Sequence, residues 1–219
     1  MDDVYRQLRS DLDDALARKD RPAAVRLTLH AVRELHVDVP RLYTEVLGPL
    51  LVDTGSRWQS GATRVWQEHY ASATVRTIIE ALYPLVLDAA EDIAPAGHTA
   101  LLACPPREQH DLGLRMLADR FALGGWTVHY LGTDTPVDEI CSAASELGAD
   151  TIVLSASTHF NRVLLRRVVD EIKAGAPHAR VLVGGPAFAR DRSWPADELL
   201  DPDALGLPPL PQRTGEAGA

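Results

Sequence analysis

The sequence has few cysteines, few aromatic residues and no excess of basic residues, and each shortage excludes a class of protein. Its two cysteines, Cys104 and Cys141, stand far apart, so no disulfide framework is expected, which suits a reducing cytoplasm. Lysine and arginine total 22 against 31 aspartates and glutamates, a net charge of -9, which argues against direct binding to nucleic acid. No apolar run is long enough to span a bilayer, and the N-terminal stretch is charged throughout. We therefore expect a soluble cytoplasmic protein.

Residues 1–92 predict a four-helix bundle, because apolar residues recur there at three- and four-residue spacing. The breaks between the helices fall near residues 19–22, 37–40 and 57–63. In the last helix, predicted over 63–90, His69 shares a mainly apolar stripe with Val65 and Ala73. We expect this stripe to face inward.

From residue 98 onward, short apolar runs alternate with amphipathic helices. The predicted strands are 99–104, 126–132, 151–157 and 180–185. The predicted helices between them are 111–123, 137–147 and 161–174. This alternation predicts a Rossmann-like, doubly wound parallel sheet over residues 98–207. The Pro-rich segment 208–219 predicts a disordered tail.

Polar residues and glycines follow three of the predicted strands, where an open parallel sheet binds its ligands. His110 follows the first strand, Ser155 and Ser157 follow the core of the third, and Gly184 and Gly185 close the fourth. The serines offer hydroxyl groups, and the glycine pair allows close backbone approach to a flat or bulky group. We expect these residues to surround one ligand.

His110 fits two interpretations: an ordinary solvated residue at a helix start, which is the commoner case for a lone histidine, or a metal ligand. A ligand histidine needs its other ring nitrogen held by a carboxylate or carbonyl group, and Glu108 and Asp111 are both near enough in sequence. No other His or Cys stands at tetrahedral zinc spacing. A lone histidine ligand instead indicates a metal that a macrocycle already holds.

Residues 108–113 read E-x-H-x-x-G, directly after the first predicted strand. With the downstream serine and glycines, this motif resembles the cobalamin-binding domain of methionine synthase, corrinoid methyl carriers and cobalamin photoreceptors. The resemblance implies that His110 is the lower cobalt ligand in place of dimethylbenzimidazole, that Glu108 or Asp111 orients it, and that the downstream residues line a channel for the displaced tail. The implied cofactor-binding residues in this part are Glu108, Asp111, Leu112, Gly113, Ser155, Ser157, Gly184 and Gly185.

Trp58, Glu68 and His69 form a second motif, W-x9-E-H, in the helical half. Each residue alone has an ordinary interpretation, as a core aromatic, a solvated acid and a core histidine. Together they resemble the signature of CarH-type, adenosylcobalamin-dependent photoreceptors. The resemblance implies that Trp58 packs over the adenosyl group, that Glu68 hydrogen-bonds it, and that His69 becomes the upper cobalt ligand after photolysis.

These resemblances predict a non-enzymatic light sensor that binds adenosylcobalamin between the helical cap and the sheet domain. Photolysis is expected to change self-association or contact with a separately encoded partner. The similar photocobilins also hold a bilin, so a non-covalently bound bilin such as biliverdin stays open as a second chromophore. The family's regulators carry a DNA-binding helix-turn-helix domain ahead of the cap, whereas this sequence begins with the predicted cap helices, so direct operator binding is not predicted. Pro202 lies in the segment before the expected last helix, which disfavours that helix.

Three other functions stay open. A corrinoid carrier that shuttles methyl groups between methyltransferases shares this layout, although Trp58 would crowd the upper face that a shuttle leaves open. A plain cobalamin-binding module would show uptake without a change in assembly. A flavodoxin-like receiver or nucleotide-binding domain is disfavoured, because no phosphate-binding glycine loop follows the first strand.

Overall fold

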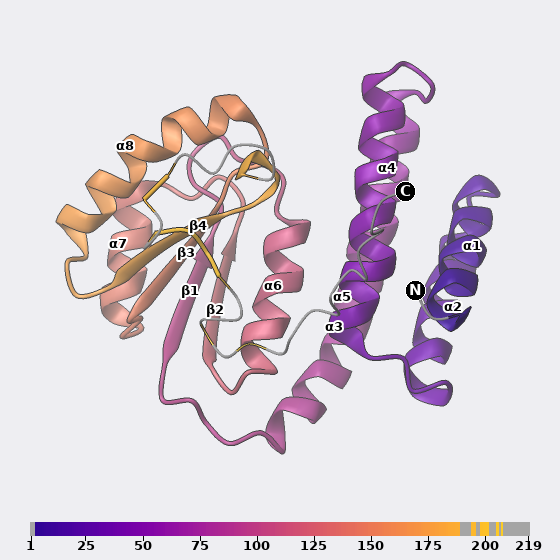
Figure 1. Cartoon of the computed structure of the whole chain (residues 1–219), viewed down its shortest axis with the longest axis horizontal. Coiled ribbons are helices and arrows are strands. Elements are labelled where there is room, and N and C mark those ends of the chain that lie inside the picture. Colours follow the sequence, from indigo (N-terminus) through magenta and orange to yellow (C-terminus); the bar gives the residue numbers. More distant parts are fainter. Residues whose placement is uncertain (1–2, 189–193, 196–197, 202–204, 206, 208–219) are drawn as a thin grey trace, which may run out of the picture. The chain divides into compact units, whose positions relative to one another are not determined.

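The computed structural model describes residues 3–188, 194–195, 198–201, 205 and 207. The chain divides into two compact units, with the boundary between Val86 and Leu87 (Figure 1). The boundary therefore falls within a helix, the one that spans Val65–Glu91. The predicted tail, 208–219, lies outside the described residues.

The helical unit is built from four helical segments, as predicted. Its elements are α1 (Asp3–Ala17), α2 (Arg21–Glu34), α3 (Val39–Arg41), the π-helical turn η1 (Leu42–Leu47), α4 (Gly48–Gln59) and α5 (Val65–Glu91). The third segment is continuous from α3 through η1 to α4. Side chains cap the helices that follow two of the three predicted breaks: the Asp20 carboxylate accepts a hydrogen bond from the amide of Ala23, and Asp38 accepts one from the amide of Arg41. In the described part of the chain, no helix has both the length and the apolar character needed to cross a bilayer.

The buried face of α5 differs from the predicted one. The side chains that α5 buries are Ala71, Thr74, Val75, Ile78, Ile79, Leu82 and Val86. Val65, His69 and Ala73 lie on the exposed side, so the prediction that this stripe faces inward is wrong. The larger aliphatic residues further along α5 remove more apolar surface from water than this short stripe can.

The second unit contains a four-stranded parallel sheet in the order β2-β1-β3-β4. The strands are β1 (Thr99–Ala103), β2 (Thr127–Gly132), β3 (Thr151–Ser155) and β4 (Arg180–Gly184). The helices between them are α6 (Leu112–Ala122), α7 (Val137–Glu146) and α8 (His159–Gly175). All seven predicted elements of this half are confirmed, with ends shifted by no more than two residues.

Helices cover both faces of the sheet, as a doubly wound fold requires. One core packs α6 residues such as Phe121 against Leu102. The other packs α7 and α8 residues such as Leu165 against Leu101, so neighbouring residues of β1 face opposite layers. Figure 1 shows α6 on one side of the sheet and α7 with α8 on the other. The predicted Rossmann-like architecture is therefore confirmed.

Candidate functional site

The site lies where the strand order reverses, which is where doubly wound sheets bind their ligands. The chain leaves β1 toward β2 on one side and later returns past β1 to β3 on the other. The loop after β1 carries Glu108 and His110, and the loop after β3 carries Ser157. The fold therefore brings together residues that are 47 and 49 positions apart in the sequence.

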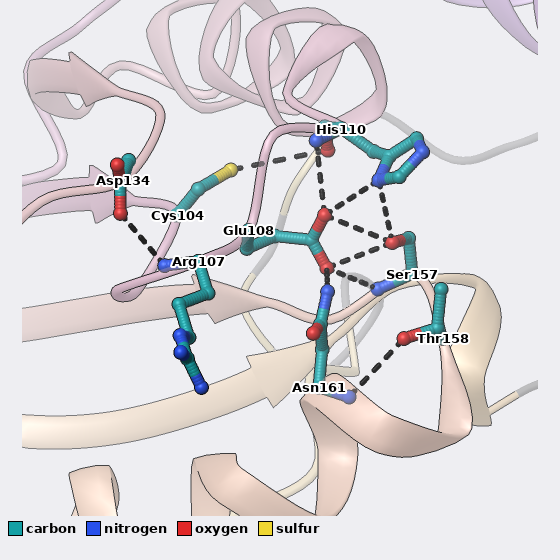
Figure 2. A network of polar contacts seen from close by, with 8 residues as sticks. All are labelled: Cys104, Arg107, Glu108, His110, Asp134, Ser157, Thr158 and Asn161. Atoms are coloured by element: carbon teal, nitrogen blue, oxygen red, sulfur yellow. Dashed lines mark hydrogen bonds and ion pairs between the residues drawn. The ribbon is translucent and has the colours of Figure 1, made fainter.

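The Glu108 carboxylate is the centre of this site, and its side chain is fully buried. Its Oε1 accepts a hydrogen bond from the His110 backbone amide at 2.9 Å and lies 2.7 Å from His110 Nδ1. Its Oε2 accepts hydrogen bonds from the Ser157 backbone amide and from Asn161 Nδ2, each at 2.7 Å. The Ser157 hydroxyl lies 2.9 and 2.8 Å from the two oxygens (Figure 2). The carboxylate thus joins the β1 loop, the β3 loop and the start of α8.

These donors keep Glu108 ionised in spite of its burial. Burial alone raises the pKa of a carboxyl group, but the hydrogen bonds from His110, Ser157 and Asn161 outweigh that effect and lower the pKa of Glu108 to about 2. A buried carboxylate at neutral pH is stable only when hydrogen bonds replace its lost hydration. The site therefore holds a fixed negative charge next to the histidine.

The His110 imidazole is held at one edge and exposed at the other. Nδ1 lies 2.7 Å from Glu108 and 2.8 Å from the Ser157 hydroxyl, whereas the side chain as a whole is 69% exposed. Figure 2 shows the second ring nitrogen on the side of the ring that faces away from both partners. In the tautomer that donates Nδ1–H to the carboxylate, Nε2 carries the lone pair that a metal ligand needs.

The backbone of the β1 loop is fixed by Asp134, from the loop after β2. Arg107 adopts a left-handed conformation, with φ 72°, and its amide donates a 2.7 Å hydrogen bond to the Asp134 carboxylate. The Asp134 amide in turn donates to the Glu108 carbonyl oxygen at 3.0 Å. A non-glycine residue holds this conformation only when its surroundings enforce it. Asp134 and Asn161 were missing from the predicted site residues, because no local motif marks either of them.

The other predicted residues of the β1 loop have separate surroundings. Of the two acids proposed to orient His110, Glu108 is the one placed against Nδ1, whereas buried Asp111 accepts a 2.7 Å hydrogen bond from the Tyr130 hydroxyl. Leu112 begins α6, and the position that a Gly113 Cβ would take has no atom within 4 Å. Burial, followed by the charges of Glu108 and Asp111, raises the pKa of the Cys104 thiol to about 12, so this cysteine stays protonated.

The glycine pair at the end of β4 is packed against the chain itself. A Cβ on Gly185, which has φ 103°, would lie 2.5 Å from the Ala156 carbonyl oxygen and 2.7 Å from Ser155 Oγ. A Cβ on Gly184 would lie 3.3 Å from the Leu200 side chain. The close approach that these glycines permit is therefore between segments of the protein. Their role in a ligand channel stays a prediction.

Replacing Gly185 by alanine is expected to lower the free energy of unfolding by about 2 kcal/mol, from backbone strain and from contact with Ala156. Chemical denaturation of the cofactor-free protein measures this change. Gly148→Ala is the matched control, because Gly148 also has a positive φ, 64°, but has no atom within 4 Å of its Cβ position. The control should lose about 1 kcal/mol. Equal losses in the two variants would show that close packing at Gly185 contributes nothing.

The three candidate residues of the helical unit are exposed or partly exposed. Trp58 lies at the end of α4 and is 45% exposed. Glu68 and His69 lie at the start of α5, where His69 Nδ1 is 2.6 Å from Glu68 Oε2. The Ser72 hydroxyl donates a 2.6 Å hydrogen bond to the other Glu68 oxygen. His69, with its side chain 73% exposed, is thus held by a carboxylate in the same manner as His110.

The donor set would fit a cobalt ion that a macrocycle already coordinates. Such an ion would need a single protein nitrogen, and His110 presents a largely exposed imidazole whose Nδ1 and orientation are fixed. Within the described residues there is no group of three or more His, Cys, Asp or Glu side chains that could hold a bare metal ion.

Known proteins resemble both halves of the chain. Residues 98–201 match a family model described as B12 binding domain, and residues 8–83 match a second family model with the same description. The HTH-type transcriptional repressors CarH and CarA of Myxococcus xanthus are 35% identical over 153 residues and 36% identical over 154 residues. These alignments cover 67% and 68% of this chain but only 48% of each repressor, so the chain spans about half the length of these relatives.

A solved structure shares the fold. The monomethylamine corrinoid protein of Methanosarcina barkeri superposes with a TM-score of 0.71 over 84% of this chain and 87% of that protein, at 16% identity. At this identity the likeness concerns the fold alone. The two family matches go further: each half of the chain matches a B12 binding domain, and these matches indicate a cobalamin or corrinoid cofactor.

Proposed function

We propose that the protein binds adenosylcobalamin and acts as a light sensor. His110, oriented by Glu108 and Ser157, would hold cobalt from the lower side. Trp58 would cover the adenosyl group, and Glu68 would hydrogen-bond to it. When bound, adenosylcobalamin supplies a cobalt–carbon bond that visible or near-ultraviolet light breaks.

The light-sensing proposal rests on His69, a second histidine whose ring nitrogen is held by a carboxylate. His69 is exposed and has its Nδ1 fixed 2.6 Å from Glu68, so it has the features that make His110 a suitable ligand. A methyl carrier needs an open upper face and has no use for a second ligand there. The identity to CarH and CarA supports the same choice. We propose that His69 supplies the second nitrogen ligand after illumination and that self-association or partner binding changes as a result.

The proposal covers cofactor binding and the response to light. The two repressors contain as much chain again beyond the matched part, so their DNA-binding role is not transferred to this protein. No feature of the described residues favours a bilin over cobalamin alone, and the proposal does not include one.

Illumination of the protein reconstituted in the dark with adenosylcobalamin is expected to change both its absorption spectrum and its elution volume in size-exclusion chromatography. His69→Ala should leave binding in the dark unchanged and alter only the illuminated spectrum, because His69 acts after the adenosyl group has left. His30→Ala, an exposed histidine on α2, is the control and should behave as the wild type.

An unchanged spectrum and elution volume after illumination would exclude the sensor. Selective binding of methylcobalamin without a light response would favour the corrinoid methyl carrier instead. An illuminated His69→Ala spectrum identical to that of the wild type would remove His69 from the upper position.

A further inference from the structure

Asn161 connects the start of α8 to the Glu108 carboxylate. The Thr158 hydroxyl caps α8 by accepting a 3.1 Å hydrogen bond from the Asn161 backbone amide. The Asn161 side chain is thereby directed back toward the β1 loop, where its Nδ2 donates a 2.7 Å hydrogen bond to Glu108 Oε2 (Figure 2). The Asn161 backbone amide thus takes part in the cap of α8, whereas its side chain binds the Glu108 carboxylate.

The two Glu108 oxygens have different partners. Oε1 lies against the amide and ring nitrogen of His110, whereas Oε2 receives the Ser157 amide and the Asn161 side chain. The Ser157 amide lies just before α8 and the Asn161 side chain lies in its first turn, so both donors meet Oε2 at the N-terminus of a 17-residue helix, which favours a negative charge. The N-terminal end of α8 therefore fixes one oxygen of the carboxylate, and the other oxygen faces the histidine.

We propose that Asn161 is a positioning residue that sets the rotation of the Glu108 carboxylate and, through it, the orientation and tautomer of the His110 ring. The torsion that turns a glutamate carboxylate is soft, so hydrogen bonds rather than rotamer preference fix its angle. Ser157 Oγ lies within 2.9 Å of both Glu108 oxygens and so does not select between them. The Ser157 backbone amide and the Asn161 side chain both donate to Oε2, and Asn161 is the side chain that distinguishes the two oxygens.

The consequence for cofactor binding rests on the proposed function, in which His110 is the lower cobalt ligand. Partners of a metal-binding histidine that do not touch the metal typically contribute about 10–100-fold to metal affinity. Asn161 acts through Glu108 rather than on the ring itself. Its loss should therefore cost about 10-fold, at the lower end of that range.

The test combines a measurement on the cofactor-free protein with one on binding. Asn161→Leu removes the donor and keeps the branching of the side chain at Cγ, Asn161→Ala is a second variant without the donor, and Asn161→Gln retains an amide. Arg167→Gln, which alters only a surface ion pair of α8 with Glu171, is the control. Imidazole ¹⁵N NMR of the cofactor-free protein reports the His110 tautomer, and titration with hydroxocobalamin gives the Kd.

Wild type and Arg167→Gln should show a single His110 tautomer with the proton on Nδ1. Asn161→Leu and Asn161→Ala should show a mixture of tautomers and a Kd raised about 10-fold, and Asn161→Gln should restore part of both. Asn161→Ala decides the question if Asn161→Leu does not fold. An unchanged tautomer in the variants that lack the donor overturns the proposal, whether or not affinity falls. If wild type does not bind hydroxocobalamin, the proposed function fails, whereas the tautomer comparison still tests Asn161.

Discussion

Replacing His110 by alanine is expected to weaken adenosylcobalamin binding by about 100-fold, because the ligand itself should contribute at least as much as the groups that hold it, whose upper limit is about 100-fold. The variant removes the only imidazole that the Glu108 network holds at the carboxyl edge of the described sheet. Cobalamin that still binds should keep its own dimethylbenzimidazole base on the metal. Titration followed by absorption spectroscopy measures both the Kd and the state of the base.

The control for this variant is His178→Ala. His178 is exposed in the turn between α8 and β4, at the edge of the sheet opposite the site. The His178→Ala variant should bind adenosylcobalamin with the same Kd as the wild type. If His110→Ala binds as tightly as wild type and gives the same spectrum, His110 is not the lower ligand.

Replacing Glu108 by glutamine is expected to lower the free energy of unfolding of the cofactor-free protein by about 3 kcal/mol at pH 7. Glutamine places an NH2 group among donors that need an acceptor, and it removes the charge that they stabilise. This loss follows from the pKa of Glu108, which falls from 4.5 to about 2 in the folded protein, since one pKa unit is worth about 1.4 kcal/mol.

The stability lost in Glu108→Gln should become smaller as the pH falls. Because folding lowers the pKa of Glu108, its stabilising effect is complete above pH 4.5 and is lost as the pH falls toward about 2. The stability difference between wild type and Glu108→Gln should therefore shrink between pH 5 and pH 3. Urea denaturation across this range measures the difference. Glu139→Gln, at an exposed position on α7, should show no such trend, and a difference that stays constant for Glu108→Gln would contradict the proposed network.

The elements of the sheet domain were predictable because burial follows sequence periodicity. β1 and β3 are buried along almost their whole length, and both appear in the sequence as short continuous apolar runs. Their order along the chain, each followed by a helix, is enough to predict a parallel sheet with its loops at one edge. The position of His110 at that edge follows from the sequence for the same reason.

The helical unit shows the limit of this reasoning. Periodicity correctly separated its four segments, but the stripe containing His69 was assigned to the wrong side of α5. Two stripes of the helix carry apolar residues, and which of them is buried depends on the surfaces that neighbouring helices offer. The stripe from Ala71 to Val86 is the buried one, and this leaves His69 exposed beside Glu68.

The sequence by itself determined the layered architecture, the E-x-H-x-x-G segment at the end of the first strand and the W-x9-E-H spacing of Trp58, Glu68 and His69, because these depend on local spacing. Tertiary structure decided that Glu108 rather than Asp111 holds His110, that Asn161 joins the site, and that the glycine pair is packed against its own chain. Asn161 and Glu108 are 53 residues apart, and Ser157 and Glu108 are 49 residues apart. Contacts of that range form only when β1 and β3 lie side by side in the sheet, so no local pattern encodes them.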